Sequence, residues 1–156
     1  MNKKTIIYTT FFLFLLLFLS ASYAEAATYY VRADSNDSCN GTVDVSGSSG
    51  NCAKKTIQAG VDLALTAGDT VIVHAGTYNS ATPIFTSKAN GSSGSLITIR
   101  AATGETVSIT RAAITHNYNK MQGFRATSPG AYNAAAILLS GNYNTATENT
   151  VVSNCT

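Results

Sequence analysis

Acidic residues, the groups most often used in sugar chemistry and metal binding, are sparse in the second half of the chain. Beyond position 62 they are Asp69, Glu105 and Glu148, which are far apart and lie among turn residues. A calcium site needs several clustered oxygen ligands, and a glycosidase needs two carboxylates on either side of the bond it breaks. These three acids predict neither site. The chain therefore shows no catalytic constellation, its catalytic residues stay unknown, and no metal site is expected.

Two arginines have a spacing that a repeating structure would bring together. Arg100 and Arg125 are 25 residues apart, and Lys120 lies between them. Stacked on neighbouring repeats, they would grip an anionic sugar. The alternative is that they are solvated positions on an outward-facing sheet, where isolated charges contribute little. We favour the solvated interpretation and keep Arg100 and Arg125 as candidate carbohydrate-binding residues.

Aromatic and imidazole side chains give two further candidates. Tyr118 and Tyr143 occupy the centre of a repeated Asn-Tyr-Asn and can stack on sugar rings, although tyrosine is also an ordinary strand residue. We take this pair as the first candidates for carbohydrate contact. His74 and His116 could transfer protons because imidazole titrates near neutrality. Neither has an acidic partner at close spacing, so we expect no catalytic role for them.

The first residues read as an export signal. Two lysines precede an apolar run over 6–19, and small residues around Ala24 and Ala26 form cleavage boxes. The alternative is a retained membrane anchor, but the run is shorter than the ~20 residues that span a bilayer. We therefore expect residues 1–24 to be a signal peptide, with cleavage at 24 or 26. The mature protein would be secreted, extracellular or periplasmic, and not bound to a membrane.

The charge of the mature chain argues against nucleic acid as a partner. Without Lys3 and Lys4, eight of the ten Lys and Arg residues remain, against eight Asp and Glu. A nearly neutral chain has no basic face of the kind that binds phosphate backbones.

We expect a single domain over 25–156, acting as a monomer.

Three cysteines remain after export. Cys39 and Cys52 can close a small loop by a disulfide, which is the usual state of paired cysteines in an exported chain. A metal site is the alternative, but no His lies near the pair. Cys155 is left as a buried thiol or as half of a bridge to a partner outside this sequence. The segment DSNDS at 34–38 has a faint likeness to a calcium loop, but it lacks the glycine and the closing glutamate, so a surface turn is expected.

The chain between these residues predicts one helix among many short strands. Thr56 can cap a helix whose apolar residues fall on one face, and Gly68 can end it, which places the helix at about 56–67. The apolar face consists of Ile57, Val61, Ala64 and Leu65. Runs with strand character or buried apolar residues lie at 29–31, 69–78, 95–101, 106–110, 135–140 and 149–154.

These runs recur at nearly regular intervals. Val71 to Ile97 is 26 residues, Ile97 to Met121 is 24, and Met121 to Ala146 is 25. A period near 25 with short strands predicts a solenoid, in which each turn buries its apolar face on the next. A β-sandwich with coincidental spacing is the alternative.

The segments TYYVRAD, KKTIQAGVDLALTAGDTVIVHAGTY and SLITIRAATGETVSI, within 28–109, resemble the N-terminal part of pectate-lyase-like proteins. The resemblance implies an all-β right-handed parallel β-helix whose helix covers the open first coil, and a chain incomplete at its C-terminus. It further implies a secreted protein that acts on or binds acidic polysaccharide. In full-length form such a protein would be a polysaccharide lyase, with Ca²⁺ as a cofactor to be considered, while this portion alone would be inactive. One alternative is a non-catalytic surface or adhesive β-helix that binds glycans or has a structural role, and another is a truncated remnant with no activity.

Overall fold

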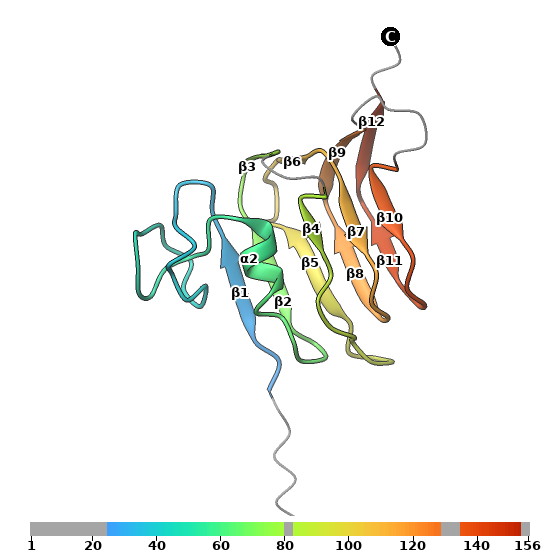
Figure 1. The fold of residues 1–156 in the computed structure, drawn as a ribbon, viewed down its shortest axis with the longest axis horizontal. Helices are drawn as coiled ribbons and strands as arrows, with labels where there is room; N and C mark the ends of the chain where they lie inside the picture. Colours follow the sequence, from blue (N-terminus) through green and yellow to red (C-terminus); the bar gives the residue numbers. More distant parts are fainter. Residues whose placement is uncertain (1–24, 80–82, 129–134, 154–156) are drawn as a thin grey trace, which may run out of the picture.

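The computed structural model describes residues 25–79, 83–128 and 135–153, in which short strands form three sheets (Figure 1). The five-stranded sheet contains, in order, β1 (Thr28–Val31), β2 (Thr70–Val73), β5 (Ile97–Ala101), β8 (Asn119–Gln122) and β11 (Thr145–Thr147). The four-stranded sheet contains β3 (Gly76–Tyr78), β6 (Val107–Ile109), β9 (Phe124–Ser128) and β12 (Thr150–Ser153). The three-stranded sheet contains β4 (Phe85–Thr86), β7 (Ala112–Ile114) and β10 (Ile137–Leu139).

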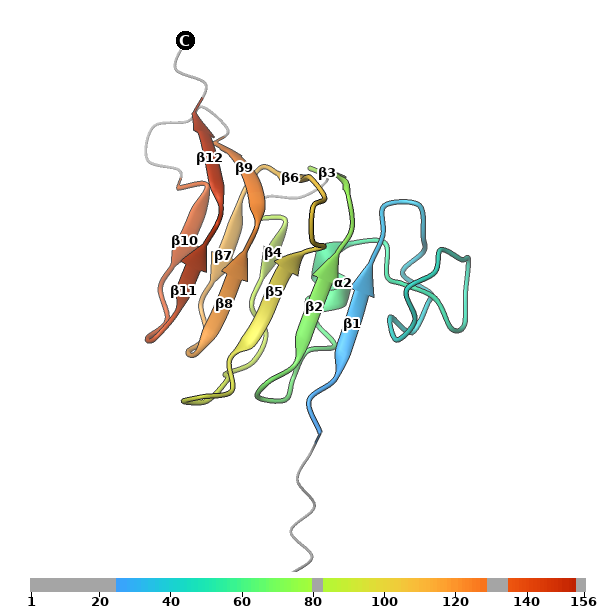
Figure 2. The same ribbon diagram turned by 180° about the vertical axis from the view of Figure 1, so that it is seen from behind.

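The chain visits the three sheets in a fixed order. β2, β3 and β4 belong to the five-, four- and three-stranded sheets, and the same order returns with β5 to β7 and with β8 to β10. Every pairing between these strands is parallel. Figure 2 shows the strands of the five-stranded sheet side by side from β1 to β11. The all-β class predicted from the sequence is confirmed, and the pairing differs from that of an antiparallel sandwich.

Alternation of apolar and polar residues places the core between the sheets. In β5, Ile97, Ile99 and Ala101 are buried while the two residues between them are partly exposed. The register puts Ile99 beside Val71 on one side and Met121 on the other, so apolar side chains form a row inside the sheet. Figure 1 shows β4 in one sheet and β9 in another, and their Phe85 and Phe124 rings meet with centroids 6.0 Å apart. Burial of each such side chain stabilises the fold by about 1.5–3 kcal/mol.

The helix is shorter than the sequence predicts. The helix α2 covers Ile57–Val61, not 56–67, although Thr56 caps it as expected by accepting the Ala59 N–H at 3.2 Å. Beyond Val61, the N–H groups of Leu63 and Ala64 reach only three residues back, to Gly60 and Val61, so the chain tightens and leaves the helix.

The conformation of the residues after the helix is determined by a buried carboxylate, that of Asp69, and not by the helical spacing of apolar residues. Asp69 accepts the N–H of Thr66 at 2.9 Å and that of Ala27 at 2.8 Å, which folds the segment into a turn. Leu65 is 56% exposed, so the expectation that it faces the core is wrong. Gly68 has the predicted left-handed φ of 97°, but it lies well beyond the end of the helix.

The 25-residue period holds for one of the three intervals. Met121 pairs with Ala146 as predicted, but Val71 and Met121 both pair with Ile99, not with Ile97. Ile97 and Ile99 are both buried on the same face of β5, so the apolar pattern could not distinguish them. The run at 135–140 is a second correction, because Leu138 and Leu139 are 36% and 41% exposed rather than buried.

Several predictions concern residues outside those described. The signal peptide at 1–24 and Cys155 are among them. Within the described residues, no helix is long and apolar enough to cross a membrane.

Candidate functional site

The outer face of the five-stranded sheet carries two cations on adjacent strands. Thr98 lies opposite Lys120 and Arg100 lies opposite Gln122, so the two cations occupy diagonal positions on β5 and β8. Both side chains are partly exposed, because they alternate with residues that are buried in the core. Among the described residues, neither cation forms an ion pair with a carboxylate. This leaves both available to an anionic ligand.

Arg125 does not belong to this surface. It lies on β9 of the four-stranded sheet, where its register partners are Ser108 and Thr150. The expected stacking of Arg100 on Arg125 is therefore wrong. Gly123, with a φ of 80°, turns the chain between the sheets, and the 25-residue interval spans that turn. The two arginines consequently lie on different sheets.

Tyr118 and Tyr143 do lie together. Their rings are stacked, with centroids 4.7 Å apart and an angle of 10° between the planes. Both residues have a left-handed backbone, with φ of 54° and 58°; Tyr118 directly precedes β8, and Tyr143 lies two residues before β11. Tyr143 is 71% exposed. An exposed, flat aromatic ring beside a sheet is a suitable surface for the apolar face of a sugar ring.

Asparagine side chains explain why the tyrosines hold this strained conformation. The side-chain oxygen of Asn90 accepts the N–H of Asn117 at 2.8 Å, and that of Asn117 accepts the N–H of Asn142 at 2.8 Å. In the opposite direction, Asn144 accepts the N–H of the buried Asn119 at 2.8 Å. Each turn is thus bonded to the next through side-chain oxygens that complete the backbone hydrogen bonding. Only the repeated Asn-Tyr-Asn signalled this arrangement in the sequence.

A second group of polar side chains lies around His74, at the end of β2. Its Nδ1 lies 3.1 Å from Oε1 of Glu105, and its Nε2 lies 2.9 Å from Oδ1 of Asp44. The second contact is close, but its atoms are not aligned as a hydrogen bond. Sequence spacing could not indicate these partners, because each is about thirty residues away from His74 along the chain. The expectation that His74 has no acidic partner is therefore wrong.

Neighbouring groups lower the pKa of two carboxylates near His74, those of Glu105 and Asp34. The backbone N–H of Ala75 and the His74 ring lower the pKa of Glu105. Arg32, which binds Asp34 through Nε at 3.1 Å, lowers the pKa of Asp34. The Nη1 atom of Arg32 also lies 3.4 Å from Oδ1 of Asp44. Arg32 thus shares Asp44 with His74.

Two shallow polar recesses lie next to each other where the strands β2 and β5 of the five-stranded sheet end. One, of about 210 Å³, is lined by residues that include Arg32, Asp34, His74 and Glu105. The other, of about 230 Å³, is lined by residues that include Arg100, Glu105, Gln122 and Glu148. In the second recess, Gln122 donates to Glu148 at 2.8 Å. Glu105 borders both recesses, so Arg100 and the His74 cluster are neighbours.

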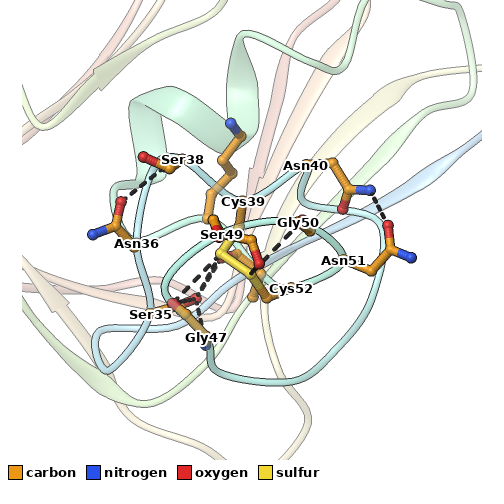
Figure 3. Close-up of a disulfide and its surroundings, with 12 residues drawn as sticks. Ser35, Asn36, Ser38, Cys39, Asn40, Gly47, Ser49, Gly50, Asn51 and Cys52 are labelled. Atoms are coloured by element: carbon orange, nitrogen blue, oxygen red, sulfur yellow. Dashed lines mark hydrogen bonds between the residues drawn. A yellow bond between two sulfur atoms is a disulfide. The ribbon is translucent and has the colours of Figure 1, made fainter.

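A loop closed by a disulfide covers the outer edge of β1. Cys39 and Cys52 are bonded and almost fully buried, and Figure 3 shows Ser35 and Gly47 beside them. The N–H of Tyr30 in β1 donates to the carbonyl of Gly41 in the loop at 2.8 Å. Asp44 belongs to the same loop, so the disulfide also places one partner of His74.

The described residues do not fit a calcium ion. They contain no group of three or more acidic, histidine or cysteine side chains that could hold a metal. In the segment 34–38, Asp37 is engaged by the protein itself, because its Oδ1 accepts the N–H groups of Lys55 at 2.8 Å and Thr56 at 2.9 Å. The expected surface turn therefore serves as an anchor in front of the helix. His116 contacts the hydroxyls of Ser87 and Thr115, each at 3.2 Å, and not a carboxylate of the described residues.

Comparison with known proteins gave no match. No protein-family model, no curated protein and no solved structure is similar to this chain.

Proposed function

We propose that this chain is the N-terminal part of a secreted right-handed parallel β-helix protein that resembles the pectate-lyase-like group and binds acidic polysaccharide. Support for the fold comes from the repeated visits of the chain to three parallel sheets in the same order. Asparagine side chains that bond one turn to the next, such as Asn117 to Asn142, also suit stacked coils. The resemblance within 28–109 supplies the family.

The observation that carries the binding proposal is the charge of the outer face of the five-stranded sheet. Its described strands place Arg100 and Lys120 at diagonal positions on neighbouring strands, and no carboxylate lies at an outward position of these strands. Neighbouring strands of a sheet are about 4.8 Å apart. Regularly spaced anionic groups along a glycan could therefore contact both cations in succession. A neutral glycan would gain nothing from them.

Tyr143 supplies the second element of the binding surface. Its ring is supported on one side by Tyr118 and is largely exposed, at the end of the five-stranded sheet from which β11 begins. A sugar ring can stack on the exposed ring while its anionic group reaches toward Lys120. Tyr118 positions Tyr143, and Tyr143 makes the contact.

The binding test uses the exported, oxidised chain and a polyuronate, with neutral dextran as the comparison glycan. We expect calorimetric binding to polyuronate that weakens with added salt, because exposed charges are screened. Replacing Arg100 or Lys120 by Gln should weaken binding roughly two- to five-fold for each charge. The matched control is Arg125→Gln, an exposed arginine on another sheet, which should bind like the natural chain. Equal binding of both glycans, or equal loss in the control, would refute the proposal.

Lyase activity belongs to the full-length form in this proposal and not to the chain described here. Proton abstraction beside a uronate needs a base with a suitable pKa and cations that neutralise the substrate acid. Asp69, Glu105 and Glu148 are each already bound by the protein, as Glu148 is by Gln122. We therefore expect no rise in absorbance of unsaturated products from pectate or alginate, with or without Ca²⁺. Activity of the isolated chain would instead favour an enzyme site within it.

A further inference from the structure

The position of His74 between two carboxylates has a consequence for its protonation. Glu105 faces Nδ1, with its oxygens at 3.1 and 3.2 Å, and Asp44 faces Nε2 at 2.9 Å. A neutral imidazole carries one N–H, so it can satisfy only one of these carboxylates and must present a lone pair to the other. The imidazolium form, with two N–H groups, is attracted to both. The geometry therefore favours the charged ring.

The two carboxylates belong to segments that are otherwise separate. Asp44 lies in the disulfide loop over β1, and Glu105 lies in the turn between β5 and β6. His74 itself follows β2, and its N–H donates to the carbonyl of Val31 at 2.9 Å. One ring thus connects the loop to the sheet.

We infer that His74 is a pH-dependent clamp that holds the disulfide loop to the sheet when its ring is doubly protonated and releases the loop side when the ring becomes neutral. Release occurs on the Asp44 side for two reasons. Glu105 has a second donor in the Ala75 N–H, and its contact with Nδ1 is an aligned hydrogen bond. The Asp44 contact is not aligned, and it depends on charge.

Other charged groups near the ring also affect how strongly the disulfide loop is held to the sheet. Arg32 lies 3.4 Å from Asp44 and keeps part of the attraction on the loop after His74 loses its proton. Asp34 is bound by Arg32 and adds negative potential around His74. The Tyr78 hydroxyl donates to the backbone carbonyl of His74 at 3.1 Å and stays neutral over the range in which histidines titrate. The facing carboxylates thus outnumber the facing cation.

The direction of the pH effect follows from which form is held. Both carboxylates attract the imidazolium form, so the clamp holds while the ring carries both protons and is lost when the ring releases one. At lower pH the attraction also falls, when Glu105 is protonated below its lowered pKa. The clamp therefore requires a charged Glu105 together with a doubly protonated His74.

The test combines ring spectra of the natural chain with one matched pair of variants. We expect ¹⁵N spectra to show both His74 nitrogens protonated at about pH 5 and one protonated at about pH 8. Over the same range, the backbone amides of Val43, Asp44 and Val45 should shift together. A ring that keeps one form across this range, or a loop whose amides do not follow the ring, would overturn the inference.

Thermal unfolding gives the second measurement. His74→Gln should lower the melting temperature by roughly 2–4 °C at about pH 5 and by less at about pH 8. The chain has two histidines, so the control is His116→Gln, whose ring faces hydroxyls. His116→Gln should leave unchanged the difference between the melting temperatures at the two pH values. An equal loss at both pH values for His74→Gln would show a packing role only and would contradict the clamp.

Discussion

The side-chain amide of Gln58 pairs with both backbone groups of Thr86. Its Oε1 accepts the Thr86 N–H at 2.8 Å, and its Nε2 donates to the Thr86 carbonyl at 3.2 Å. Thr86 lies in β4, the end strand of the three-stranded sheet, and α2 lies beside it (Figure 1). The glutamine therefore completes the edge of β4 as a neighbouring strand would. An exposed strand edge invites pairing with other chains, and here the helix covers it.

Removing this amide should destabilise the fold more than removing an exposed one. Gln58→Ala leaves a partly buried N–H and carbonyl of β4 without partners, which costs about 1–3 kcal/mol. The measurement is the midpoint of urea unfolding. Gln122→Ala is the control, because its amide bonds only to the exposed Glu148 and its loss should cost less than about 0.5 kcal/mol. Equal costs would mean that the amide contributes nothing at the strand edge.

The disulfide loop protects β1, an end strand of the five-stranded sheet, in a similar way. The loop carbonyl of Gly41 accepts the Tyr30 N–H, and the Lys54 N–H donates to the Tyr30 carbonyl, both at 2.8 Å. Replacing Cys39 and Cys52 by Ser should lower the free energy of unfolding by about 2–4 kcal/mol, because the unfolded chain gains freedom. It should also increase association of the folded chain, since the β1 edge becomes accessible.

Unfolding and light scattering check this prediction in a Cys155→Ser background, so that the remaining thiol cannot exchange. Reductant should reproduce both effects in the chain that keeps the disulfide, and it should have no effect on the double serine variant. Unchanged scattering after reduction would show that the loop stays over β1 without the bridge.

Much of the strand content could be read from the sequence, because apolar alternation is a local property. The runs around Tyr30, Ile72 and Ile99 all became strands. The register between strands was harder to predict, because several residues on a buried face, such as Ile97 and Ile99, fit the apolar pattern equally well. The length of α2 was missed because Asp69, a residue outside the helical pattern, directs the chain after Val61.

Prediction of the site had the same limit. Tyr118 and Tyr143 could be predicted as a pair because each is the central residue of the repeated Asn-Tyr-Asn, and their rings stack in the structure. His74 and Glu105 were not, because their contact depends on the turns after β2 and β5 lying side by side. Once the pairing of β2 with β5 is known, His74 and Glu105 can be recognised as neighbours, because each lies in the turn that follows one of these strands.

Burial of Tyr78 predicts a loss of stability at alkaline pH. Burial raises the pKa of Tyr78 to about 12 from 10.0, so folding favours the neutral phenol. The contribution is fully present below pH 10 and is lost as the pH rises through about 12. Urea unfolding at about pH 8 and about pH 11 should show this loss. Tyr78→Phe should be about 1 kcal/mol less stable at the lower pH, because the hydroxyl bond to the His74 carbonyl is removed, and should show a smaller alkaline loss. The same alkaline loss in both chains would exclude Tyr78 as its source.

Gly60 should resist replacement even though it lies in a helix. A β-carbon there would lie 2.5 Å from Cγ2 of Val31 and 3.1 Å from Cγ1 of Val71, both fully buried residues of the sheet. Gly60→Ala in an exposed helix gains about 1 kcal/mol, but overpacking a core costs about 1–3 kcal/mol. We therefore expect a net loss in urea unfolding, because β1 and β2 cannot both retreat from α2. Val31→Ala removes the nearer methyl groups, so the double variant should lose less than the sum of the single losses, with a coupling of about 1 kcal/mol. Stabilisation by Gly60→Ala alone would place α2 farther from the sheet than the structure does.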